Sequence, residues 1–364
     1  HLEDTVNFDF DENDSSKLED HYSPLLKEMI ASFESYLPPL PVVNSYKQHF
    51  YENVYSLLPF ADLRTFHDCI TEVVIADPAN PEKCKLNLGN AGIRNKIENI
   101  CILACVLKIS YMFMSMLEEG ELIKQDQFDK YMSLETLHKY PIKNDIIVDV
   151  LRCLISENWA KCPNENIVSI LLYMWAFFVF SPDEGDFFAT NPTEFVCDLV
   201  VMLSSAIGLH RDPNDYAEIR NHKNKRLKNH RRLLWLSVIS MSSYENALKG
   251  RRVSIKRLLD SFIDISSPMA FENYMNRIKE DLVPECQLTT FTISLHEMAW
   301  RRTHLALLHQ NLNGLTMSYN KPVALWDIEK AMSYIDVYIK EHLRFKSDNV
   351  NVVQLEGSPE DVLH

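Results

Sequence analysis

The sequence predicts an all-α protein, a multi-helix bundle, on three observations. Glycine is scarce, with 8 among 364 residues, where average usage near 7% would supply about 25. Apolar residues recur at helical spacing along most of the chain. We find no convincing run of alternating apolar and polar residues that would indicate strands, and no internal repeat. Scarce glycine also disfavours folds that depend on tight turns or on glycine-rich phosphate loops.

The expected helices follow from apolar spacing and from the residues that begin and end them. Order is expected from near His21, and Pro38 ends the first helix. A second helix at about 44–57 precedes a third that Asp62 can cap, whereas 77–92 reads as a loop. Further helices are expected at about 97–117, 166–180, 194–209, 229–248, 254–263, 269–281, 288–312 and 325–345.

Two of these helices are apolar on nearly every face. The segment 97–117 is long enough to suggest a membrane span, but Lys108 lies at its centre and Glu98 and Glu118 flank it. Charges at these positions favour a buried core helix. The run from Ile167 to Phe180 has 14 residues, too few to cross a bilayer. No membrane partner is therefore expected.

Composition divides the chain into three parts: an acidic segment at 1–20, a helical regulatory domain at 21–346 and a polar tail at 347–364. The acidic segment carries eight carboxylates and one lysine, interleaved with aromatic residues. It is either a solvated tail or a segment that contacts coactivators. The chain begins at His1 rather than Met and shows no targeting peptide, which indicates a fragment.

Charge and cysteine content limit the function classes. The 37 basic and 51 acidic residues give a net charge of −14, which repels phosphate backbones and makes direct DNA docking unlikely to be the role of this chain. The eight cysteines form no C-x-x-C pair and lie mostly in apolar runs. This pattern indicates a reducing compartment and neither a disulfide scaffold nor a zinc knuckle. No cofactor is expected within the chain.

The sequence lacks the motifs of common enzyme classes. G-x-S-x-G, G-x-x-x-x-G-K-[ST] and G-x-G-x-x-G are all absent. HEMAWRRTH at 296–304 approaches a zinc-protease motif, but Trp300 occupies the position that the second histidine needs. The carboxylates at 183, 184 and 186 are typical of a solvated loop. The chain is therefore expected not to be an enzyme.

Two further features leave alternatives open. Cys162 precedes Pro163, as in haem-regulated sites where a thiolate binds iron; otherwise Pro163 simply begins the following helix. The stretch from Arg220 to Arg232 holds seven cations. It is either a nuclear-import signal or partner-binding patch, or a solvated loop before a helix.

Three ordered segments carry a family resemblance: LSSAIGLHRDPNDY (203–216), NHRRLLWLSV (229–238) and ALKGRRVSI (247–255). They resemble the middle homology region of fungal binuclear zinc-cluster transcription factors. SYKQHFYENVYSLLPF (45–60), HKYPIKNDII (138–147) and the segment 156–188 are similar to the oleate-responsive members of that family. The resemblance runs from about 18 to 320 and is densest between 138 and 258.

The resemblance implies a ligand-responsive regulatory domain of a nuclear transcription activator. The implied ligand is a long-chain fatty acid such as oleate, and the implied targets are peroxisome and β-oxidation genes. The family's DNA-binding module carries six cysteines around two zinc ions, and no such pattern occurs in this chain. DNA contact is therefore expected through a module outside it. The implied partners are a second zinc-cluster factor, as a homo- or heterodimer, and a transcription coactivator.

Methionine and aromatic residues suit a pocket for a flexible apolar ligand. We place this pocket among the helices 97–117, 166–180, 195–209 and 231–248, with Arg211 or Lys249 near the head group. The expected lining residues are Met174, Trp175, Phe178, Met202, Leu203 and Trp235. On this hypothesis Met202→Glu abolishes fatty-acid binding. Two alternatives are a ligand-free scaffold for dimerisation or inhibition, and a haem or redox sensor acting through Cys162.

Overall fold

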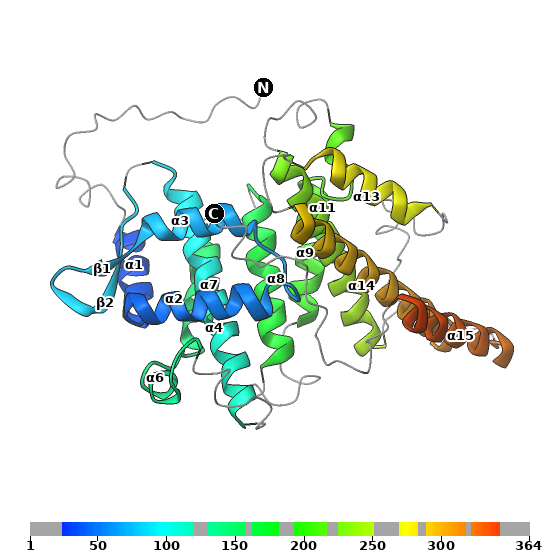
Figure 1. The fold of residues 1–364 in the computed structure, drawn as a ribbon, viewed down its shortest axis with the longest axis horizontal. Coiled ribbons are helices and arrows are strands. Elements are labelled where there is room, and N and C mark those ends of the chain that lie inside the picture. Colours follow the sequence, from blue (N-terminus) through cyan, green and yellow to red (C-terminus); the bar gives the residue numbers. More distant parts are fainter. Residues whose placement is uncertain are drawn as a thin grey trace. The chain divides into compact units, whose positions relative to one another are not determined.

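The computed structural model describes residues 24–89, 91–119, 130–156, 162–181, 193–216, 225–250, 269–282, 289–317 and 322–342 (Figure 1). Within these ranges the secondary structure is helical apart from one two-stranded hairpin. The predicted all-α fold class is confirmed. The expected helix at 254–263 and the segments 1–20 and 347–364 lie outside the described residues.

The chain divides into two compact units. The first comprises the segments up to Lys47 and between Thr65 and Glu157, and the second comprises Gln48–Arg64 and the chain from Asn158 onward. The sequence predicts a single helical domain over 21–346. The segment 48–64 thus connects two parts of the first unit while belonging to the second.

The first unit contains most of the elements before residue 157. They are α1 (Pro24–Tyr36), α2 (Leu40–His49), α3 (Leu63–Val73), β1 (Val74–Asp77), β2 (Asn80–Leu86), α4 (Ile93–Glu119), α6 (Leu134–Lys139) and α7 (Asp145–Ser156). Helices α4 and α7 pack together, and α1 packs against both α7 and β2.

The β1–β2 hairpin replaces part of the loop expected at 77–92. The strands pair antiparallel, with Val74 opposite Leu86 and Ala76 opposite Cys84. Cys84 and Leu86 are buried while the intervening lysine is exposed, so a short alternation was present in the sequence. The backbone N–H of Ala79 donates to Asp77 Oδ1 at 2.9 Å, which fixes the turn. The loop interpretation of 80–86 was therefore wrong.

Helix α4 is the long apolar helix of the first unit. Its part Ile93–Met116 has the length and hydropathy of a membrane span, and 78% of its most apolar window is buried inside the structure. The central Lys108 donates from Nζ to the carbonyl of Ile142 at 2.9 Å and lies 5.3 Å from the ring centroid of Tyr111. A buried cation with these partners fits a core helix.

The second unit is built from longer helices. After the π-helical turn η2 (Phe50–Val54) come α8 (Glu165–Phe180), α9 (Thr193–Ala206), the 3₁₀ turn η4 (Pro213–Asp215), α11 (Lys225–Leu248), α13 (Ala270–Glu280), α14 (Thr289–Thr316) and α15 (Leu325–His342). Helix α11 packs against α8, α9 and α14. The bounds of α8, α13 and α14 agree with the expected helices to within a few residues.

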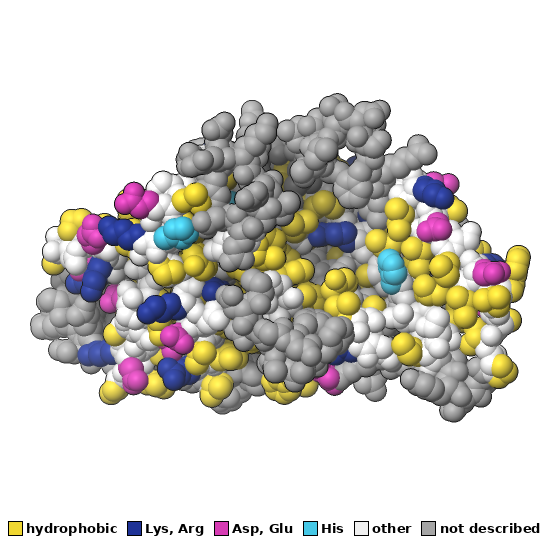
Figure 2. Space-filling model, turned by 90° about the horizontal axis from the view of Figure 1, so that it is seen from below, with side chains coloured by type: hydrophobic (Ala, Val, Ile, Leu, Met, Phe, Trp, Pro, Cys, Tyr) yellow, Lys and Arg dark blue, Asp and Glu magenta, His cyan; other side chains and the backbone are white. Residues whose placement is uncertain are grey.

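Helix α8 shows how the sequence sets these elements. Asn164 is its N-cap, and its side chain accepts the backbone N–H of Ile167 at 3.0 Å. From Ile167 to Phe177 every residue is buried, as a helix without a polar face requires. Helix α15 contrasts with it. Its Leu325, Trp326 and Tyr334 are exposed, and hydrophobic side chains gather at the α15 end of the molecule in Figure 2.

Candidate functional site

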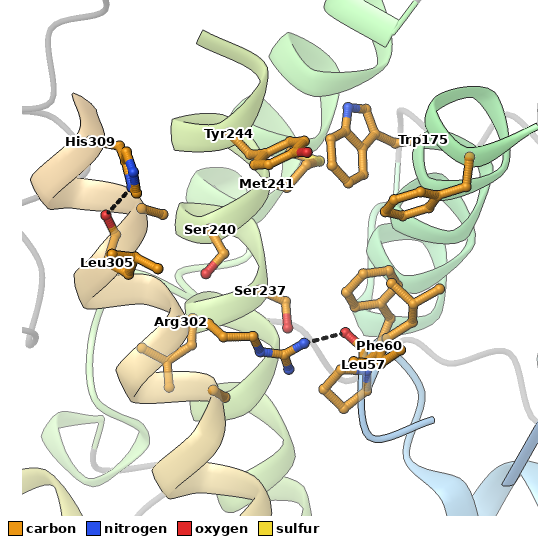
Figure 3. Close-up of a pocket in the computed structure, with 16 residues that line it drawn as sticks. Leu57, Phe60, Trp175, Ser237, Ser240, Met241, Tyr244, Arg302, Leu305 and His309 are labelled. Atoms are coloured by element: carbon orange, nitrogen blue, oxygen red, sulfur yellow. Dashed lines mark hydrogen bonds between the residues drawn. The ribbon is translucent and has the colours of Figure 1, made fainter. Parts of the chain in front are cut away.

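A cavity of about 380 Å³ lies within the second unit. Its walls come from α8, α11, α14 and the chain segment 57–60, which we call the strap (Figure 3). The lining residues are Leu57, Leu58, Pro59, Phe60, Trp175, Phe180, Leu236, Ser237, Ser240, Met241, Tyr244, Ala299, Arg302, Leu305, Ala306 and His309. Most of this surface is apolar, and its volume lies in the range of small-molecule pockets, about 300–1,000 Å³.

Small side chains keep the two longest walls apart. Ser237 and Ser240 on α11 and Ala299 and Ala306 on α14 line the cavity. Their spacing follows the three- to four-residue periodicity that places side chains on one helix face. Ser240 Oγ lies 2.8 Å from Thr303 Oγ1, so the two helices are joined by a hydrogen bond next to the space. The helices therefore form walls without filling the cavity.

The strap is fixed to α8 by its carbonyl groups. The hydroxyl of Tyr173 donates to the carbonyl of Leu58 at 3.2 Å and accepts the N–H of Ala61 at 3.2 Å. Ser169 Oγ donates to the carbonyl of Phe60. Tyr173 and Ser169 are buried, and buried hydrogen bonds of this kind are expensive to leave unmade. The part of the strap from Leu58 onward is therefore anchored to α8.

Arg302 is the cation of the cavity. Its two terminal nitrogens donate to the carbonyls of Leu57 at 2.6 Å and Ser56 at 3.1 Å, and Figure 3 shows the side chain reaching from α14 to the strap. Burial lowers the pKa of its guanidinium to about 10, so it stays charged at neutral pH. Within the described residues it forms no ion pair with a carboxylate.

Trp175 and Tyr244 line the end of the cavity opposite Arg302, and their rings meet edge to face with centroids 6.3 Å apart. Trp175 Nε1 donates to the buried carboxylate of Glu245 at 3.0 Å. The same carboxylate accepts from Thr193 Oγ1 at 2.8 Å and pairs with Lys249 Nζ at 3.1 Å. The indole is thus held in one orientation by a carboxylate whose charge is itself paired with a lysine.

Of the eight ligand residues expected from the sequence, Trp175 lines this cavity and the other seven do not. Met174, Leu203 and Trp235 are buried core residues, and Phe178 is half-buried on α8. Met202 is 56% exposed. Arg211 is exposed beside the ring of Tyr216. Lys249 is engaged by Glu245. That these seven residues bind a ligand at a site other than this cavity stays a prediction.

Neither Arg302 nor the strap is among the ligand residues predicted from the sequence. The available signal is the arginine pair in HEMAWRRTH, a segment that resembles a zinc-protease motif. His296 in that motif is buried and lies 2.6 Å from the hydroxyl of Tyr274, and burial lowers its pKa to about 3. In the described part of the chain, no group of three or more His, Cys, Asp or Glu side chains is arranged to hold a metal ion.

The basic stretch differs from both of its expected forms where it is described. Arg226 pairs with Asp62 at 3.2 Å, Arg231 pairs with Glu165, and Arg232 is fully buried. These arginines therefore belong to internal ion pairs of the second unit. Residues 220–224 of the stretch and the acidic cluster at 183–186 lie outside the described residues. Cys162 is exposed.

Arg232 is the centre of a buried ionic cluster. It donates to both carboxylate oxygens of Asp212 at 3.0 Å and to Asp281 at 2.7 Å. Burial alone would raise the pKa of the Asp212 carboxyl, but the hydrogen bonds and charge of Arg232 hold it below its usual value. Arg277 and Lys228 complete the cluster. It joins the η4 turn, α11 and α13, and none of its residues lines the cavity.

Comparison with known proteins gives related transcription regulators. The chain is 41% identical over 336 residues to oleate-activated transcription factor 1 of Saccharomyces cerevisiae, covering 89% of this chain and 31% of the relative. It is 37% identical over 347 residues to the peroxisome proliferation transcriptional regulator of the same yeast, covering 94% and 34%. A third yeast relative, regulator of drug sensitivity 1, is 26% identical over 63% of this chain and 26% of its own length.

The chain spans about a third of the length of the first two relatives. No protein-family model matches it, and no solved structure matches it. The relatives are regulators of transcription, which agrees with the expectation that the chain is not an enzyme. The identity to two such proteins over about nine-tenths of the sequence confirms the resemblance: the chain belongs to the fungal zinc-cluster transcription regulators.

Proposed function

We propose that this chain is a ligand-responsive regulatory region of a transcription activator and that it senses a long-chain fatty acid. The observation that carries the proposal is the largely apolar cavity among α8, α11, α14 and the strap. The name of one relative describes that protein as oleate-activated, and another relative is named for peroxisome proliferation. Oleate, which the first name specifies, is a long-chain fatty acid.

The energetics of burial support an acyl chain as the ligand. Each CH₂ group removed from water contributes about 0.8 kcal/mol, so even half of a long chain offers several kcal/mol before the costs of ordering are subtracted. Leu236, Met241 and Leu305 supply apolar contact along the walls. Methionine in particular adapts to a flexible ligand.

DNA binding, dimerisation and coactivator recruitment would be functions of the whole regulator. We propose that it acts in the nucleus and binds DNA through a module with two zinc ions outside this chain. A second zinc-cluster factor would complete a dimer, and a coactivator would read the ligand-bound state. The net charge of −14 supports this division of labour, because this surface repels a phosphate backbone.

The test is thermal unfolding of the chain with and without oleate. A ligand specific to the folded state stabilises it by about 2.7 kcal/mol at one hundred times its Kd, so the melting temperature should rise. Ala306→Trp fills the cavity and should abolish the rise. The control is Met202→Glu at an exposed site on α9, which should leave the rise unchanged.

The outcomes separate the possibilities. If Met202→Glu abolishes binding and Ala306→Trp does not, the ligand lies in the pocket first expected from the sequence. If oleate neither stabilises the chain nor co-purifies with it in native mass spectrometry, the fatty-acid proposal fails. The ligand-free dimerisation scaffold is then the better description.

A further inference from the structure

We propose that Arg302 is the specificity-determining residue of the cavity: it receives the carboxylate of an anionic amphiphile by releasing the backbone carbonyls of Ser56 and Leu57. This inference rests on the proposed function and names the atoms that select the ligand. It also assigns a local structural consequence to binding, because the released carbonyls lie at the start of the strap.

Arg302 stands apart from the other arginines of α11 and α14. Arg226, Arg231 and Arg232 each pair with a carboxylate, and Arg301, the neighbour of Arg302, pairs with Glu297. Arg302 donates only to two neutral carbonyls within the described residues. In a chain with 51 acidic residues, a guanidinium that lines an apolar cavity without such a partner is suited to an anion from outside.

The guanidinium has capacity for such a ligand. It carries five N–H donors in a planar fork, and two of its terminal groups are engaged by Ser56 and Leu57. A carboxylate accepts two parallel hydrogen bonds from this fork, and it adds the attraction between opposite charges, which a neutral carbonyl does not supply. Exchange of the carbonyls for a carboxylate is therefore favourable.

The cost of releasing the two carbonyls is small. The hydrogen bond to the Leu57 carbonyl is exposed and the bond to the Ser56 carbonyl is part-buried, so water can replace Arg302 at Leu57. The carbonyls of Leu58 and Phe60 are held independently by Tyr173 and Ser169. The change is therefore confined to Ser56 and Leu57, next to the π-helical turn, and the anchored part of the strap keeps the wall of the cavity in place.

This chemistry predicts which ligands the cavity distinguishes. A neutral amphiphile of the same length, such as oleyl alcohol or methyl oleate, buries the same acyl chain. It has no negative charge to offer Arg302 in place of the two carbonyls. It should bind without engaging Arg302. Oleate should bind more tightly than either neutral analogue.

Binding of oleate and oleyl alcohol to the full chain and its variants tests the inference. A hydrogen bond to a charged group contributes about 1.5–3 kcal/mol, which corresponds to about a 10- to 150-fold change in Kd. Arg302→Gln should weaken oleate by this factor and leave oleyl alcohol unchanged, while Arg302→Lys should retain part of the preference. Arg301→Gln is the matched control and should bind both as the wild type does.

Hydrogen exchange provides the second measurement. Oleate should accelerate amide exchange in a peptide covering 55–58, because binding removes the hydrogen bonds from Arg302 to this segment. In Arg302→Gln the same peptide should exchange fast without ligand. Equal oleate affinity in Arg302→Gln and the wild type, with each folded by circular dichroism, would overturn the inference and leave the fatty-acid proposal standing. Failure of the wild type to bind oleate at all would reject the proposed function instead.

Discussion

Replacing Arg232 by methionine tests whether the buried ionic cluster holds the second unit together. Arg232 is fully buried and makes three hydrogen bonds to Asp212 and Asp281. Methionine fits an apolar interior, but it leaves two buried carboxylates without their main partner. The loss is therefore expected to come from uncompensated charge rather than from an empty space.

The magnitude follows from the partners that remain. Removing one member of a buried ion pair costs about 3–5 kcal/mol. Arg277 still lies 3.0 Å from Asp212, and Lys228 still lies 3.5 Å from Asp281, so neither carboxylate is left entirely unpaired. We therefore expect the lower end of the range, a decrease of about 3 kcal/mol in the free energy of unfolding.

Urea unfolding followed by circular dichroism measures this change. The matched control is Arg226→Met, because Arg226 is 39% exposed and pairs with Asp62 at 3.2 Å; it should lose less than about 1 kcal/mol. Adding Asp212→Asn to Arg232→Met should cost less than the two single changes summed, since they share one interaction. A loss below 1 kcal/mol in Arg232→Met, equal to that of the control, would refute the reasoning.

Two further predictions concern a turn and a titrating group. Gly208 has φ +73° and faces the hydroxyl of Tyr216, so Gly208→Ala should lower the free energy of unfolding by about 1 kcal/mol or more. Gly314→Ala, in an open helical position, should raise it by up to about 1 kcal/mol; similar effects in urea titrations would contradict this. Burial lowers the pKa of His296 to about 3. Below pH 6.5 this histidine therefore binds a proton in the unfolded chain but not in the folded chain. Stability should fall by about 1.4 kcal/mol per pH unit as pH drops from 6.5 toward 3, and His296→Gln should flatten the measured slope by that amount.

The spacing of apolar residues predicted most helices, because the residues that a helix buries recur at regular intervals within its own sequence. The continuous apolar run of α8 predicted that helix. Its N-cap Asn164, directly after Pro163, was not identified from the sequence, and in the structure the helix begins at Glu165. The β1–β2 hairpin was missed because its alternation extends over few residues, and lysines on its exposed face resemble a loop. The two-unit division was not visible either, since 48–64 crosses into the second unit without any change in composition.

The cavity could not be found from composition for a different reason. Methionine and aromatic residues identify candidates for a pocket, yet Met174 and Trp235 satisfy the same rule by filling the core. What opens the cavity is the meeting of small side chains on α11 and α14, and what gives it a charge is Arg302. Arg302 contacts Ser56 and Leu57 from about 245 positions away, and no local sequence pattern reveals a contact over that distance.

The positions that carry the family resemblance form only part of the cavity. The strap, Trp175 on α8 and Ser237 on α11 lie in resembling segments, whereas the α14 wall lies where the resemblance thins. The segment containing GLHRDP and the arginine pair of α11 build the Arg232 cluster, whose atoms face η4 and α13. The cavity also depends on α14, which supplies Ala299, Arg302 and Ala306, and the family resemblance thins over α14. A shared scaffold can therefore carry cavities whose α14 wall differs in chemistry. This arrangement is consistent with relatives named for oleate and for drug sensitivity both aligning with this chain. It follows that membership of the family identifies the framework, whereas the ligand must be argued from Arg302 and the walls around it.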